Sequence, residues 1–260
     1  MTGSAGPPSF RLAYVPGVMP GKWVGVWRER LPGVPLSLEQ VEAADAADVL
    51  LGRAADVGLV RLPVDRTVLS AIPLYTETTV VVVPRDHVFT AVDEVTADDM
   101  ADEIVLNPLD DVLGWRPSPG LPARERPATT EDAVRLVAAG IGVLVVPLSL
   151  ARLHHRRDLA HVPVADAPRS EVALSWPEDG HTDLVEEFIG IVRGRTVNST
   201  RGRGRTPGAR DAERATPRRD SRAGGGSAGS PTGGRPSGRD PRRGSGAGGS
   251  RGRGRPRRRS

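Results

Sequence analysis

The 260-residue chain has a formal net charge of +4, but residues up to Val192 hold 16 Lys and Arg against 28 Asp and Glu, and residues from Arg193 onward hold 20 Arg against 4 acids. An acidic body of net charge −12 is therefore followed by a basic tail of net charge +16. The chain has no cysteine, which excludes disulfides and thiolate chemistry. It has no secretion signal at its start and no apolar run of the roughly 20 residues that span a bilayer, which favours a cytoplasmic protein without a membrane segment.

The first third of the body predicts strands that alternate with helices. Trp23, Trp27 and Leu31 are spaced by four and mark one face of a helix. Such alternation predicts parallel strands joined by right-handed crossovers. The predicted strands are 10–15, 34–41 and 57–62, and the predicted helices are 22–31 and 43–53.

The rest of the body predicts a second set of strands and helices. Residues 69–75 and 78–83 are apolar runs with two residues between them, and we interpret them as a strand pair. Thr129 or Thr130 is the predicted N-cap of a helix. The other predicted elements are strands at 103–106, 143–146, 161–164 and 171–176, helices at 131–139 and 182–192, a helical turn at 96–101 and a proline-rich loop at 107–127.

Apolar periodicity stops after Arg193. The remaining residues are mostly Arg, Gly, Ser and Pro and include no aromatic side chain. They cannot bury enough apolar surface to offset backbone ordering of about 1–2 kcal/mol per residue, so we predict that residues 196–260 are disordered. Such a tail would attract phosphates and bind DNA or RNA without sequence preference, or it would stay solvated or fold back on the acidic body.

Three stretches of the body carry a resemblance to one known family: RLAYVPGVMPG at 11–21, DVGLVRLPVDRTVLSAIPLYTETTVVVVPRDHVFT at 56–90 and TTEDAVRLVAAGIGVLVVPLSLA at 129–151. In order and spacing they resemble the effector-binding (substrate-binding) domain of LysR-type transcriptional regulators. The resemblance implies an α/β, two-lobed, periplasmic-binding-protein-like (type 2) fold with a ligand between the lobes. It places the domain at 9–195, lobe 1 at 9–84 and 175–195, lobe 2 at 85–174, and the crossings near Val83–Arg85 and Ser175–Trp176.

Strand order and resemblance together place a ligand site beyond the carboxyl ends of the strands. The start of the helix at Thr129 and Thr130 would suit a carboxylate, and Arg61 would pair with the same anion. Alternatively, Arg61 pairs with an acid such as Asp65 and one threonine is an ordinary N-cap. Trp115, in the proline-rich loop, is a candidate lid for the cleft. The predicted ligand-binding residues are Pro16, Gly17, Val18, Met19, Gln40, Arg61, Leu62, Asn107, Thr129, Thr130, Val146 and Pro147.

The resemblance implies a small-molecule sensing domain that is linked to transcriptional regulation and forms homodimers. Met1 lies nine residues before the first predicted strand, so we expect the family's helix-turn-helix head to be absent. One alternative is a nucleic-acid-associated protein that acts through its tail and uses the body as a dimerisation scaffold, and another is an enzyme on the same fold. We expect neither catalysis, cofactor nor metal, because no GxSxG, GxxxxGK[ST] or HExxH motif occurs and His154 and His155 lack a third ligand.

Overall fold

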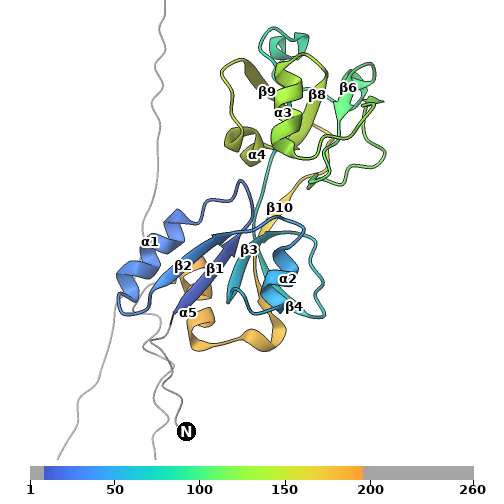
Figure 1. Cartoon of the computed structure of the whole chain (residues 1–260). Helices are drawn as coiled ribbons and strands as arrows, with labels where there is room; N and C mark the ends of the chain where they lie inside the picture. Colours follow the sequence, from blue (N-terminus) through green and yellow to red (C-terminus); the bar gives the residue numbers. More distant parts are fainter. Residues whose placement is uncertain (1–8, 196–260) are drawn as a thin grey trace, which may run out of the picture. The chain divides into compact units, whose positions relative to one another are not determined.

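The computed structural model describes residues 9–195, which form two five-stranded sheets flanked by helices (Figure 1). The predicted two-lobed α/β fold is therefore confirmed. The prediction of disorder at 196–260 lies outside the described residues. In the first sheet the strand order is β2 (Leu36–Gln40), β1 (Phe10–Tyr14), β3 (Val57–Arg61), β10 (Glu171–Pro177) and β4 (Leu69–Thr76). In the second it is β7 (Leu121–Pro122), β6 (Ile104–Leu106), β8 (Val143–Pro147), β5 (Thr79–Pro84) and β9 (Leu159–Pro163).

The first sheet is mixed because one of its strands returns from the second sheet. β1 pairs in parallel with both β2 and β3, as the alternation of strands and helices predicts. β10 lies between β3 and β4 and is antiparallel to both. The prediction of parallel strands therefore holds for the first three strands of this sheet only.

Three helices pack on the first sheet: α1 (Gly21–Arg30), α2 (Ala46–Leu51) and α5 (Asp183–Val192). An aromatic cluster joins α1 and α5 to β1, because Phe10 stacks on Trp27 with ring centroids 4.4 Å apart and Phe188 lies 5.4 Å from Phe10. Such ring pairs contribute about 0.5–1.5 kcal/mol each beyond their buried area. This cluster fixes β1 and α1, and the loop between them carries several of the predicted site residues.

The second sheet has a core on each face. One face is covered by α3 (Thr130–Ala138) and α4 (Leu148–Leu153), and the other by the short turns η1 (Val88–Ala91) and η2 (Asp98–Met100). The loop 107–120 contributes to both cores, with Val112 on the helix side and Leu113 and Trp115 on the opposite side. Side chains alternate along β8, so Leu144 and Val146 face the helices, whereas Val143 and Val145 face the loop and Trp115. Trp115 therefore packs on the face of this sheet that is opposite to α3 and α4.

The strands β4 and β5 do not pair with each other, contrary to the prediction of a strand pair. β4 pairs with β10, where Thr76 lies opposite Glu171 and Ser70 lies opposite Trp176. β5 lies between β8 and β9 in the other sheet. Hydrophobic periodicity identifies a strand but not its partner, and the partner of β4 comes much later in the chain.

The chain changes sheets at different places from those predicted. Because β5 belongs to the second sheet, the first crossing is at Glu77–Thr78. Because β10 belongs to the first sheet from Glu171 onward, the second crossing lies at 165–170. The predicted crossings at 83–85 and 175–176 are therefore wrong, and β5 is part of the second lobe.

The helix α4 is not among the predicted elements. Its residues continue the apolar run of β8, so no change in hydrophobicity marks the end of the strand. Pro147 ends β8 and occupies the N-cap position of α4. Over residues 9–195, none of the helices is long and apolar enough to cross a membrane.

Candidate functional site

Arg61, at the carboxyl end of β3, is the centre of a buried hydrogen-bond network. Its Nε donates to Ser170 Oγ at 3.1 Å, and its Nη1 donates to the carbonyl oxygen of Pro16 at 2.9 Å. Its Nη2 donates to Glu77 Oε2 at 3.2 Å and to Ser149 Oγ at 3.1 Å. The protein itself therefore uses four of the five donors that a guanidinium carries.

This Arg61 network connects the two lobes and both crossings between them. Glu77 lies in the first crossing, Ser170 in the second, and Ser149 in α4 of the second lobe. Ser170 Oγ also donates to Glu77 Oε2 at 3.1 Å, and the Glu77 N–H donates to the Ser170 carbonyl at 2.8 Å. Movement of one lobe against the other would therefore change the contacts of Arg61.

The charges of Arg61 and Glu77 compensate each other away from solvent. Both side chains are only 5% exposed. A buried pair of this kind is costly to break, because the remaining charge is left without a partner. Its field reaches Tyr75, whose pKa is raised by burial and by the carboxylate of Glu77 and is lowered to a smaller extent by Arg61.

Gly17 allows the loop after β1 to approach the second lobe closely. Its φ is +86°, a conformation that favours glycine. A Cβ atom at this position would lie 2.6 Å from Ser149 Oγ and 3.3 Å from Arg61 Nη2. A side chain at position 17 would therefore push the loop and α4 apart.

Asp65 is not the partner of Arg61, so that alternative is wrong. The Oδ1 atom of Asp65 accepts hydrogen bonds from the Thr67 hydroxyl at 2.6 Å and from the Thr67 N–H at 2.9 Å. These two bonds lower the pKa of the Asp65 carboxyl. Asp65 thus stabilises its own surface turn, and Arg61 is neutralised by Glu77 instead.

The start of α3 already holds a carboxylate of the protein. Thr129 is the N-cap, since its hydroxyl accepts the Asp132 N–H at 3.1 Å, as one reading of the sequence predicts. The N–H and the hydroxyl of Thr130 both donate to the carboxylate of Asp110, at 2.9 Å each. Thr130 is buried, and Asp110 occupies the position at which the sequence predicts a ligand carboxylate.

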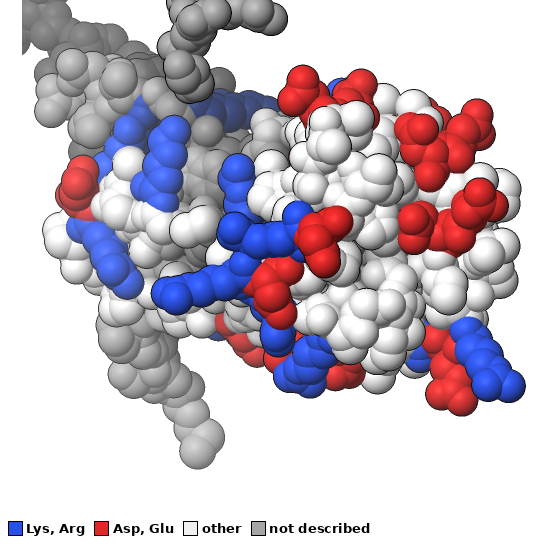
Figure 2. Space-filling view, turned by 90° about the horizontal axis from the view of Figure 1, so that it is seen from above, with Lys and Arg blue, Asp and Glu red and all other residues white. Residues whose placement is uncertain are grey.

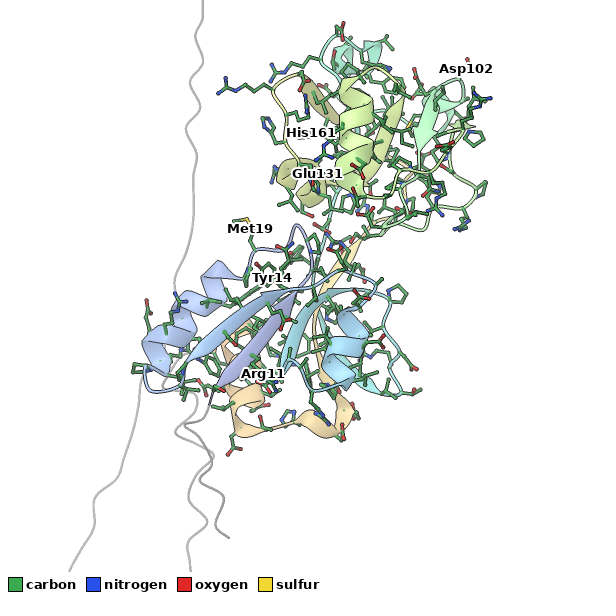
Figure 3. The ribbon with its side chains drawn as sticks, in the orientation of Figure 1. Arg11, Tyr14, Met19, Asp102, Glu131 and His161 are labelled. Carbon is green, nitrogen blue, oxygen red and sulfur yellow. The ribbon has the colours of Figure 1, made fainter. Side chains whose placement is uncertain are left out.

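The structure brings only some of the predicted site residues together. Pro16, Gly17 and Arg61 meet in the Arg61 network. Val18 and Val146 are buried in the cores of the first and second lobes, respectively. Gln40 lies at the exposed end of β2, and Met19 is 85% exposed and projects from the loop after β1 (Figure 3).

The other predicted residues make backbone or side-chain contacts of their own. The Leu62 N–H donates to the Glu171 carbonyl at 2.9 Å, and Pro147 lies opposite Thr79 between β8 and β5. Asn107 accepts hydrogen bonds from Arg126 through its carbonyl oxygen at 2.8 Å and through Oδ1 at 3.3 Å. In the described part of the chain, no three His, Cys, Asp or Glu side chains lie together as a metal site requires.

Sequence reasoning missed the acids and serines that complete the network. Glu77 carried one usable signal, because it is the single charged residue between Thr67 and Pro84. An isolated acid in an apolar stretch needs a buried cation, and Arg61 is the nearest arginine on a buried strand. Ser149 and Ser170 gave no such signal, because serine is common in loops and at helix starts.

The chain matches the family model described as LysR substrate binding domain over residues 9–196. It is similar to the HTH-type transcriptional regulator AlsR of Bacillus subtilis, with 23% identity over 180 residues that cover 64% of this chain and 58% of the relative. It is also similar to a probable hydrogen peroxide-inducible genes activator of Mycobacterium avium, with 28% identity over 198 residues that cover 71% of this chain and 63% of the relative. The chain thus spans about three fifths of each of these two curated relatives.

Solved structures show the same fold. The effector-binding domain of BenM with its effector benzoate aligns with a TM-score of 0.59 and 19% identity, covering 77% of this chain and 96% of that domain. The reduced regulatory domain of OxyR from Pseudomonas aeruginosa aligns with a TM-score of 0.56 and 20% identity, covering 74% of this chain and 97% of that domain. At these identities the likeness establishes the fold alone.

Proposed function

The chain belongs to the LysR substrate-binding domain family, and on that premise we propose that it binds a small-molecule effector between its two lobes in the service of transcriptional regulation. Its named relatives are regulators, which favours sensing over catalysis. The observation that carries the proposal is the Arg61 network, because a single buried side chain contacts both crossings and the second lobe.

An effector would act by changing the balance between lobe arrangements. A ligand shifts such a balance only as far as its affinity for the two arrangements differs. The bond between Arg61 and Ser149 belongs to the arrangement described here. A ligand that favours another spacing of the lobes would break this bond and leave the pair of Arg61 and Glu77 in place.

The effector site comprises the loop after β1, the end of β3 and the start of α3. A carboxylate is one candidate class, since benzoate is the effector of the structurally similar BenM domain. The two groups that the sequence predicts to bind an anion are already paired within the protein, because Thr130 donates to Asp110 and Arg61 donates to Glu77. A carboxylate effector must therefore displace Asp110 from Thr130 or use a cation at the exposed rim.

Thermal shift of the full chain against small carboxylates, uncharged metabolites and amines tests the effector proposal. An effector at 100 times its Kd stabilises the folded state by about 2.7 kcal/mol. Ser149→Ala should change the affinity at least severalfold because it removes a bond between the lobes, whereas Ser9→Ala, at an exposed position, should not. A library without any stabilising compound, or one whose hits bind both variants equally, contradicts the proposal.

We further propose that the body forms homodimers and that the basic tail contacts nucleic acid. The tail is favoured for this role by the net charge of +16 from Arg193 onward, which would release counterions from a phosphate backbone. Light scattering after size-exclusion chromatography measures the first property. Gel shift with mixed-sequence DNA measures the second property. Binding should fall steeply with salt and be lost when the chain ends at Thr196. Equal binding by the full and the shortened chain would refute a role of the tail.

A further inference from the structure

A pocket in the second lobe lies apart from the Arg61 network. It lies on the face of the second sheet where Leu113 and Trp115 pack. The pocket has about 300 Å³ of space outside the atoms, including the part that is open to solvent. Its apolar walls include Val105, Leu113 and Val145, and its polar and aromatic groups include Asp111, Trp115 and Ser118.

Asp111 brings to this pocket a carboxylate without a cationic partner. Its Oδ1 accepts the Leu113 N–H and its Oδ2 accepts the Gly114 N–H, both at 3.0 Å. Among residues 9–195, no Lys, Arg or His forms an ion pair with Asp111. A carboxylate offers about four acceptor sites, so the two backbone donors leave capacity for a bound donor.

Trp115 supplies an aromatic wall beside that carboxylate. The indole packs against the core formed by Val105 and Val145 and is only partly buried. The face of an indole attracts a cation that comes within about 6 Å of the ring centroid. Asp111 and Trp115 both line the pocket, so an ammonium group in it would have a carboxylate and an indole among the surrounding groups.

The chain is acidic before Trp115, whereas residues 116–127 carry Arg116, Arg124 and Arg126. Residues 86–115 contain nine Asp and Glu and no Lys or Arg. Figure 2 shows several groups of acidic side chains on one half of the face seen from above. The acids of residues 86–115 attract cations to this part of the lobe, and Arg116 opposes this attraction next to Trp115.

Two arginines lie near the pocket without being part of its lining: Arg116, between Trp115 and Ser118 in the chain, is exposed, and Arg126 contacts the wall. Arg126 donates to Asn107 Oδ1 and to the Pro108 carbonyl, so its donors are directed at neutral oxygens. Asp110, the neighbour of Asp111, is held by Thr130. Asp111 is thus the carboxylate that remains for a cation entering the pocket.

We propose that this pocket binds the ammonium head group of a small organic amine, with Asp111 as counter-ion and Trp115 as aromatic wall. The enclosed part of the pocket has room for little more than one water-sized group, so it suits the ammonium head group alone, and the alkyl chain of the ligand would remain in solvent. This site lies within one lobe and does not depend on the effector proposal.

The probe for this site is n-propylammonium, titrated into the ¹⁵N-labelled full chain in an amine-free phosphate buffer. The four tryptophans give four indole N–H signals, and Trp115→Phe identifies the one that belongs to Trp115. We expect a saturable shift of that signal with n-propylammonium and no saturable shift with 1-propanol or propionate. A response to 1-propanol of equal size would show a merely apolar pocket and overturn the proposal.

Two variants with the same charge change locate the counter-ion. Asp111→Asn keeps an acceptor for the turn and should weaken n-propylammonium binding by about tenfold or more. Asp102→Asn alters an exposed acid outside the lining (Figure 3) and should change the affinity less than about twofold. Equal effects of both variants, or an unchanged affinity in Asp111→Asn, would refute the site. Trp115→Leu should also weaken n-propylammonium binding, measured from the backbone signals of Leu113 and Gly114. Unchanged binding in this variant would show that Trp115 does not contribute to the site.

Discussion

Replacing Arg61 by Met should destabilise the protein strongly, because Glu77 would remain buried without its cation. Both side chains are 5% exposed, so solvent screens little of the lost attraction. Breaking a buried pair by removing one partner costs about 3–5 kcal/mol. For a domain of this size each kcal/mol lowers Tm by about 2–4 °C, so the expected loss is roughly 6–20 °C.

The second replacement in the same pair should reverse much of this loss. In Arg61→Met with Glu77→Gln, no buried charge is left alone, and an apolar replacement of a buried pair is often neutral or better. We expect the double variant to recover at least half of the destabilisation of Arg61→Met. Arg66→Met, at an exposed arginine in the loop after β3, is the control and should change stability by less than about 0.5 kcal/mol.

Urea unfolding followed by tryptophan fluorescence and by circular dichroism gives the four free energies of this cycle. The interaction energy between positions 61 and 77 should exceed about 1 kcal/mol. The reasoning would be refuted by a loss of under about 1 kcal/mol in Arg61→Met, or by effects of the two single variants that simply add.

Two further predictions concern the second lobe. Gly142→Ala should destabilise the protein by more than Gly140→Ala. Both residues have positive φ, but only a Cβ atom at position 142 would meet a backbone oxygen, which is that of Ile104 at 2.4 Å. Equal losses of stability in denaturant unfolding would contradict this prediction. The pKa of His161 is lowered below its ordinary value of 6.5 by burial, and to a smaller extent by the positive charges of Arg152 and His155. The contribution of His161 to stability is therefore full above pH 6.5 and is lost as the pH falls through the pKa of the folded state. His161→Gln should therefore lose less stability than the parent chain between pH 7 and pH 5, and parallel losses would show that His161 does not contribute.

The strands and helices were largely predictable because they bury continuous apolar faces. β3 and β8 are apolar throughout, and the Thr129 cap marks the start of α3. The pairing of β4 with β10 was not predictable from periodicity, because contacts between distant segments leave no local pattern. Resemblance to a family supplied the two lobes but set the crossings at the wrong residues.

The places of Arg61 and Thr130 in the fold were predictable from the sequence, whereas their hydrogen-bond partners were not. Arg61 and Thr130 do lie at a strand end and a helix start, as expected for an anion site. The acids that neutralise them, Glu77 and Asp110, come from a crossing and a loop, whose courses the sequence does not reveal. A buried charged or polar group needs a partner, but the nearest acid in the sequence, Asp65, is satisfied by its own turn.

The position of β10 constrains the order in which the protein can be completed during synthesis. Among residues 9–195, the strand β4 pairs with β10 alone, so this pairing cannot form until residues 171–177 have left the ribosome. The second lobe is continuous from β5 to β9 and can close on itself before that moment. The N-terminal lobe is therefore the last to become complete, and a stalled or prematurely ended chain would expose the open edges of β3 and β4 to other chains.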